Sequence, residues 1–162
     1  KEEQEAKIKT ALSRLTLNQY DAALDVGCGT GLLFEHVARK TGLFVGTDAS
    51  LGLLREANKK AETHRNVALV QADSDHLPFG DEVFHFVFAV TVLQNIPDPQ
   101  TTLDEIKRVS NSSAKIVVTG LRKTFTQETL EKTLSQAHLR AEFLRPDEKM
   151  RDYVAICTKT VR

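Results

Sequence analysis

Residues 24–31 of the chain read LDVGCGTG, so that glycine occupies positions 27, 29 and 31 directly after an apolar segment. The apolar run at 22–26 is short and bounded by glycine, which is typical of a buried strand. Glycine has no Cβ and therefore tolerates left-handed or crowded backbone conformations that other residues avoid. The stretch predicts a strand, a turn and a helix. It favours a ligand lying against the bare backbone of the turn over a turn that is merely tight.

Apolar periodicity alternates between two types along the rest of the chain. Short apolar runs predict six further strands, at residues 43–47, 67–71, 84–90, 115–119, 141–144 and 153–158. Apolar residues at helical spacing predict helices around residues 8–15, at 31–40, after Ser50, from Asp98 onward and at 127–138. Strands that alternate with helices predict an α/β fold with a mostly parallel sheet. The last two strands are joined too briefly for a crossover helix, so we expect them to pair antiparallel.

The composition limits what the protein does. The chain of 162 residues is long enough for one domain with its own core, and we expect residues 1–162 to form it. Lysine plus arginine equals aspartate plus glutamate, at 22 each, so the net charge indicates neither a nucleic-acid nor a membrane partner. No apolar run approaches the ~18 residues of a membrane helix. The two cysteines, Cys28 and Cys157, have no metal-ligand spacing, so we expect no metal site and no disulfide framework in a cytoplasmic protein.

The spacing of the glycines separates the candidate ligands. A dinucleotide-binding loop has the pattern G-x-G-x-x-G, whose third glycine would fall on Leu32 in this chain. The pattern here is G-x-G-x-G, with Asp25 two residues before the first glycine. A carboxylate so close to the turn would repel a pyrophosphate and attract an ammonium group. The loop therefore favours a ligand that carries an amino-acid end.

Two further aspartates follow the next two predicted strands. Asp48 ends the second strand, about 20 residues after the turn, where a carboxylate can bind both hydroxyls of a ribose. Asp73 follows the third strand and can accept a hydrogen bond from an adenine amino group. Ammonium, ribose and adenine thus each have a partner and no phosphate is provided for, which describes S-adenosylmethionine.

With these motifs in order, the chain resembles the class I S-adenosylmethionine-dependent methyltransferases of the small DVGCGTG, DAS, LPF and F-x-F-V-F type, from residue 22 to residue 158. The resemblance implies a Rossmann-like sheet of seven strands in the order 3-2-1-4-5-7-6, with strand 7 antiparallel and helices on both faces. It implies that Asp25 and the turn Gly27, Cys28, Gly29 and Gly31 hold the methionine part of the cofactor. It places Asp48 and Ala49 at the ribose and Ala72, Asp73 and Ser74 at the adenine. S-adenosylhomocysteine would be the product.

The acceptor side is expected in the segment TVLQNIPDP, which follows the fourth strand on the same edge as the glycine turn. Its Gln94 and Asn95 are neutral amides, which can orient an acceptor but cannot take its proton, and in similar methyltransferases these places are often histidines. His85 starts the fourth strand on the far side of the sheet and is expected to be structural. The acceptor stays unidentified, and the alternative to an active enzyme is a catalytically silent protein that binds the cofactor or a partner.

The third strand suggests a partner. If the resemblance holds, this is an edge strand, and residues 66–72 (NVALVQA) are free of charge and proline. Uncovered edges of this kind invite another strand. Some similar methyltransferases are stabilised by a small zinc-binding activator protein along this strand, so the resemblance implies such an activator or self-association along 66–72. Alternatively, the flanking Lys59, Lys60 and Arg65 keep the protein monomeric.

Overall fold

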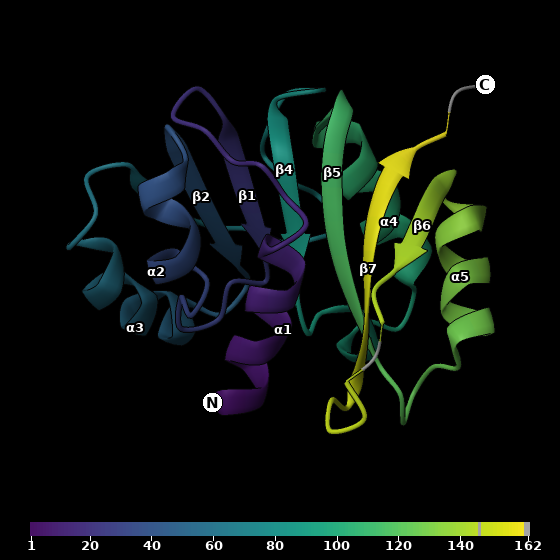
Figure 1. Cartoon of the computed structure of the whole chain (residues 1–162). Helices are drawn as coiled ribbons and strands as arrows, with labels where there is room; N and C mark the ends of the chain where they lie inside the picture. The colour runs from purple at the N-terminus through teal and green to yellow at the C-terminus, as the bar shows by residue number, and fades with distance from the viewer. Residues whose placement is uncertain (146, 161–162) are drawn as a thin grey trace.

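A computed structural model describes residues 1–145 and 147–160 and contains one seven-stranded sheet (Figure 1). The strands are β1 (Ala22–Val26), β2 (Leu43–Asp48), β3 (Val67–Gln71), β4 (Phe84–Ala89), β5 (Ser110–Leu121), β6 (Leu139–Phe143) and β7 (Asp152–Lys159). Their order is β3-β2-β1-β4-β5-β7-β6, the first five strands are parallel, and β7 is antiparallel to both β5 and β6. The predicted fold class, strand order and antiparallel last strand are confirmed.

Helices cover both faces of the sheet (Figure 1). The α-helices are α1 (Glu2–Leu12), α2 (Phe34–Val37), α3 (Leu51–Ala61), α4 (Pro99–Val109) and α5 (Gln127–Gln136), and the two 3₁₀ turns are η1 (Ala38–Lys40) and η2 (Leu93–Asn95). One apolar core lies between the sheet and α1, α2 and α3, and the other lies between the sheet and α4 and α5. The central strands are buried on both faces, which explains their nearly continuous apolar sequences.

Two predicted helix starts are confirmed by their caps. The Ser50 side chain accepts a hydrogen bond from the Leu53 N–H at the start of α3. The Asp98 carboxylate accepts one from the Gln100 N–H, and Pro99 occupies the first turn of α4. Each cap pairs a backbone N–H that has no partner within its helix, so these ends form where the sequence predicts them.

The helix predicted over residues 31–40 is wrong in extent. The chain forms turns up to Leu33, a single α-helical turn in α2 and then the 3₁₀ turn η1. Gly27, Gly29 and Gly31 all have positive φ, which a right-handed helix does not allow. The helix therefore cannot begin before the residue after Gly31. The helix predicted to reach His138 stops at Gln136, and His138 itself has a φ of 58°.

Strand β5 begins at Ser110, five residues before the predicted start of this strand. The extra residues read SNSSA and carry no apolar run that would reveal a strand. They pair with β4 through an irregular register, in which Phe84 lies opposite Ser110 while Phe86 lies opposite Lys115. Pairing with a neighbouring strand, rather than side-chain pattern, therefore determines this part of the sheet.

Candidate cofactor and active site

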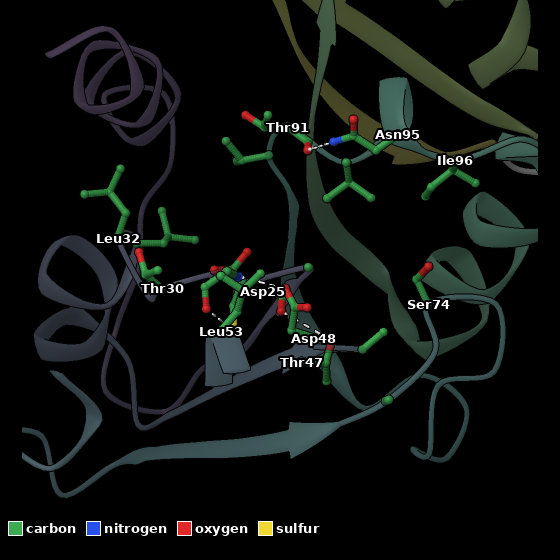
Figure 2. Close-up of a pocket in the computed structure, with 18 of the residues that line it drawn as sticks. Asp25, Thr30, Leu32, Thr47, Asp48, Leu53, Ser74, Thr91, Asn95 and Ile96 are labelled. Carbon is green, nitrogen blue, oxygen red and sulfur yellow. Dashed lines mark hydrogen bonds between the residues drawn. The ribbon is translucent and has the colours of Figure 1, made fainter. Parts of the chain in front are cut away.

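A cavity of about 580 Å³ lies at the carboxyl ends of β1, β2, β3 and β4, within the ~300–1,000 Å³ of small-molecule sites. In an open α/β sheet this is the edge where ligands bind. Figure 2 shows Asp25 and Asp48 on one side of the cavity, with Thr91, Asn95 and Ile96 across from them. The predicted site residues that line the cavity are Asp25, Gly27, Cys28, Gly29, Asp48, Ala49, Ala72, Asp73, Ser74 and Asn95. Gly31 and Gln94 are not among the lining residues.

Two positions of the glycine turn lack a side chain for different reasons. A Cβ at Gly31 would lie 2.7 Å from the ring of Phe34, so this glycine leaves room for the protein's own core. A Cβ at Gly29 would meet nothing within 4 Å, and Gly29 lines the cavity with a φ of 55°. Gly29 is therefore the position that offers open backbone to a ligand, whereas Gly31 shapes the turn from behind.

Asp25 is a buried acid at the floor of the cavity. The residue is only 4% exposed, and it lies in β1 beside the Asp48 end of β2. Burial, and secondly the negative charge of Asp48, raise the pKa of the Asp25 carboxyl to about 8. The same burial, together with Asp25 and Asp48, raises the pKa of the Cys28 thiol far above its ordinary value, so Cys28 is no nucleophile. The cavity floor is thus suited to a cationic ligand, which would favour the ionised form of Asp25.

The Asp48 carboxylate connects the glycine turn to the start of α3. One oxygen accepts a hydrogen bond from the Gly29 N–H at 2.9 Å, and the other accepts one from the Ser50 N–H at 2.9 Å. A carboxylate oxygen can accept more than one hydrogen bond, so both oxygens keep capacity for hydroxyl groups of a ligand. Asp48 has a positioning role here that its place in the sequence does not reveal.

The opposite end of the cavity is built around Thr91, just after β4. Thr91 has a φ of 61°, which is unusual for a β-branched residue. Three hydrogen bonds hold it: its N–H donates to Thr119, its carbonyl accepts from the Asn95 amide, and its hydroxyl donates to the Gln4 side chain. These partners come from β5, η2 and α1, so the strained residue is fixed from three sides.

Sequence reasoning missed the contribution of α1 to the cavity. Gln4 and Ile8 of this helix line the cavity beside Thr91. The spacing of Ile8, Ala11 and Leu12 indicates an apolar face of this helix, but no motif in the sequence connects the helix to the glycine turn. Gln94, in contrast, has its Oε1 atom buried without a hydrogen-bond partner among the described residues.

Among the described residues, the end of the cavity around Thr91, where the acceptor is predicted, carries no titratable side chain. Its described lining residues are Gln4, Ile8, Val90, Thr91, Val92, Asn95 and Ile96. His85 lies away from the cavity and accepts a hydrogen bond from the Ala22 N–H through Nδ1, a structural role. Within residues 1–145 and 147–160, no cluster of histidine, cysteine, aspartate and glutamate has a metal-binding arrangement, and no helix is long and apolar enough to cross a membrane.

A family model described as a methyltransferase domain matches residues 24–118. A demethylmenaquinone methyltransferase from Corynebacterium urealyticum is 36% identical over 110 residues, which are 68% of this chain and 46% of that protein. The chain thus spans less than half the length of this relative.

Solved structures share the fold. A SAM-dependent methyltransferase from Aquifex aeolicus superposes with a TM-score of 0.83 at 17% identity, over 93% of this chain and 88% of that one. A methyltransferase from Haloferax volcanii, solved in complex with the Trm112 methyltransferase activator, gives a TM-score of 0.83 at 16% identity, over 97% and 90% of the two chains.

Proposed function

The chain belongs to the methyltransferase domain family, and on this premise we propose that it uses S-adenosylmethionine to methylate an apolar acceptor of the reduced-quinone type. The observation that carries the choice of acceptor is the uncharged, largely apolar acceptor end of the cavity. The name of the relative from Corynebacterium urealyticum supports the same acceptor class.

The cavity fits the cofactor in three places. The open backbone at Gly29 and the buried Asp25 carboxyl would hold the amino-acid end, and Asp48 would bind the ribose hydroxyls. Ala72, Asp73 and Ser74 line the cavity where the adenine would lie. S-adenosylmethionine, when bound, supplies a methyl group that is already electrophilic. The protein's contribution is then mainly alignment, which can be worth ~7–11 kcal/mol.

A reduced quinone suits an acceptor end without a base. The two hydroxyl oxygens of a reduced ring would donate electron density to the ring carbons, so that a ring carbon could take the methyl group from the bound cofactor, leaving S-adenosylhomocysteine. The same carbon would then lose its proton to water, so the reaction would need no base from the protein. Thr91, Gln4 and Asn95 offer uncharged hydrogen-bonding groups for a ring hydroxyl, while Ile8, Val92 and Ile96 line the cavity and would contact the apolar part of the acceptor.

The experiment is methyl transfer from labelled S-adenosylmethionine to demethylmenaquinone with a short side chain, supplied reduced or oxidised. We expect label in the reduced quinone only, because the oxidised ring is not a nucleophile. Label in protein or RNA of a cell extract, with none in the reduced quinone, would contradict the proposed acceptor class.

The proposed ribose contact has its own test. Asp48→Ala should weaken S-adenosylhomocysteine binding by about 2–4 kcal/mol, because two ribose hydroxyls lose a charged acceptor.

A catalytically silent, cofactor-binding protein is the second candidate, because an acceptor that must give its proton to a base among the described lining residues at this end would not react. It predicts that S-adenosylhomocysteine binds in calorimetry while no label reaches any acceptor of a cell extract. Active turnover of any acceptor eliminates it.

We also propose that a partner strand pairs with β3, either from a small activator protein, zinc-binding as the resemblance implies, or from a second copy of this chain. Strand β3 pairs only with β2 among the described strands, and its Ala68 and Gln71 are exposed. The activator complex of the Haloferax volcanii protein supports the first occupant. An edge with unpaired N–H and C=O groups is suited to addition of a strand.

A further inference from the structure

The loop that carries Asp73 and Ser74 is attached to one face of helix α4. This loop, residues 72–83, connects β3 to β4. Side chains of α4 bond to Asp75, Leu77, Phe79 and Asp81 of the loop, and the Glu82 N–H donates to the Arg108 carbonyl at 2.8 Å. On α4 the partners are Thr102, Glu105 and Arg108, which lie three residues apart and therefore share a face. A loop of turns and bends thus runs along one face of the helix and is bonded to it repeatedly.

Arg108 makes most of these bonds. Its guanidinium donates to the carbonyl oxygens of Leu77 and Phe79 at 2.9 and 2.8 Å and to the Asp81 carboxylate at 2.9 Å. It also donates to both oxygens of Glu105, at 2.7 and 3.0 Å. Glu105 in turn accepts from the Leu77 N–H at 2.8 Å. The Arg108 guanidinium holds the pKa of the Glu105 carboxyl below its usual range, so this carboxylate stays charged at neutral pH.

Thr102 connects the same face of α4 to the cavity. Its hydroxyl, on a fully buried residue, donates to the Asp75 carboxylate. The Asp75 N–H donates to Asp73 Oδ1 at 2.9 Å, and the His76 N–H donates to the Asp73 carbonyl at 3.0 Å. Asp73 lines the cavity, so one short path of bonds runs from α4 to the adenine side of the site.

We propose that Arg108 and Thr102 are positioning residues for the adenine half of the cofactor, acting through the loop that carries Asp73 and Ser74. The inference rests on the cofactor placement given above. Neither residue lines the cavity, so neither contacts the ligand. Arg108 binds the loop mainly through the backbone carbonyls of Leu77 and Phe79. These bonds hold the backbone of the loop in place independently of the side chains that the loop carries. Loosening the loop should therefore weaken every ligand that carries adenine, and should not change the acceptor end.

The test compares Arg108→Met, Thr102→Val and a matched control, Leu134→Ala. Leu134 is fully buried under the same face of the sheet, on α5, and has no hydrogen bond to the loop, so its loss lowers stability without touching the attachment. Calorimetry measures binding of S-adenosylhomocysteine and of 5′-methylthioadenosine, which has no amino-acid end. Amide exchange measures the protection of the Leu77 and His76 N–H groups in the absence of ligand.

We expect Arg108→Met to weaken both ligands by the same factor, about tenfold, and Thr102→Val to weaken both by about threefold. Both variants should speed exchange of the Leu77 and His76 amides. The control should bind both ligands within twofold of the unmodified chain. Unchanged affinity in folded Arg108→Met, or an equal loss in Leu134→Ala, overturns the inference while the proposed function stands. Failure of the unmodified chain to bind S-adenosylhomocysteine overturns the cofactor placement itself, and this inference with it.

Discussion

At the scale of single residues, Asp25 shows how a functional position costs stability. Its carboxyl is buried beside Asp48 and has its pKa raised from 3.8 to about 8. The folded protein therefore retains a proton that the unfolded chain loses above about pH 4. Since the folded state binds more protons between about pH 4 and pH 8, this group makes the protein less stable as pH rises through that window. A cationic ligand beside Asp25 would favour the ionised carboxyl and so offset this loss of stability.

The variant Asp25→Asn tests this linkage, because an amide has nearly the same shape and does not ionise. The free energy of unfolding of the variant minus that of the unmodified chain should grow from pH 4 to pH 8, by up to ~1.4 kcal/mol per pH unit. Above pH 8 the difference should level off. Urea unfolding at four pH values measures it, and other carboxylates cancel in the comparison. A difference that is constant with pH would show that Asp25 ionises normally in the folded protein.

At the scale of elements, α1 forms part of the cavity wall through a buried ion pair. Lys7 of α1 pairs with Asp152 at the start of β7, and the two side chains are 3% and 2% exposed. The Arg151 N–H also donates to Glu3, and Gln4 accepts from Thr91. These polar contacts, together with Ile8 and Ala11 in the core, place α1 over the carboxyl ends of the strands (Figure 1).

Removing one partner of this pair should be more damaging than removing both. Lys7→Ala leaves the Asp152 carboxylate buried and unpaired, which should lower the free energy of unfolding by about 3–5 kcal/mol. The double variant Lys7→Met with Asp152→Leu should recover most of that loss, because apolar groups of similar size fill the same space. Urea unfolding of Lys7→Met, of Asp152→Leu and of the double variant measures the coupling, and Lys7→Ala measures the loss of the cation. Additive losses would show that the two residues do not interact in solution.

At the scale of the whole molecule, β3 lies at one edge of the sheet, and the backbone groups on its two sides have different partners. The Phe44 N–H donates to the Asn66 carbonyl, and the Ala72 N–H donates to the Asp48 carbonyl. Since backbone groups alternate sides along a strand, even-numbered residues of β3 face β2 and odd-numbered ones face outward. Gln71 therefore points its N–H outward, where the proposed partner strand would lie, whereas Val70 points its N–H toward β2.

This alternation supplies a matched pair of proline variants. Ala68→Lys with Gln71→Pro should abolish pairing with a partner and leave the fold intact, because only outward groups are lost. Val70→Pro should instead destabilise the sheet, because it removes a bond to β2. Light scattering of the purified chain, alone and with a Trm112-type activator protein, measures assembly, and thermal unfolding measures stability. A stable, active monomer whose assembly and activity are unchanged by the outward-facing changes contradicts the partner proposal.

The local signals along the chain predicted most of the elements because each depends on neighbours in sequence. Ser50 and Asp98 cap their helices whatever surrounds them, and the apolar residues 84–89 form a strand wherever a core covers both faces. The glycine turn with its preceding aspartate indicated the ligand edge for the same reason. Where the signals failed, as in the polar start of β5 at Ser110, the strand depends on pairing with β4 across the sheet.

The sequence by itself determined the succession of strands and helices along the chain, and it predicted that Asp25, Asp48 and Asp73 share one edge of the sheet, where all three line the cavity. Both follow from residue type and local spacing. Tertiary structure alone decided which side chains form the opposite end. It brought Gln4 of α1 to Thr91 and left Gln94 outside the residues that line the cavity. It also attached the Asp73 loop to α4 through Arg108. These contacts join segments dozens of residues apart, and packing rather than local spacing brings such segments together.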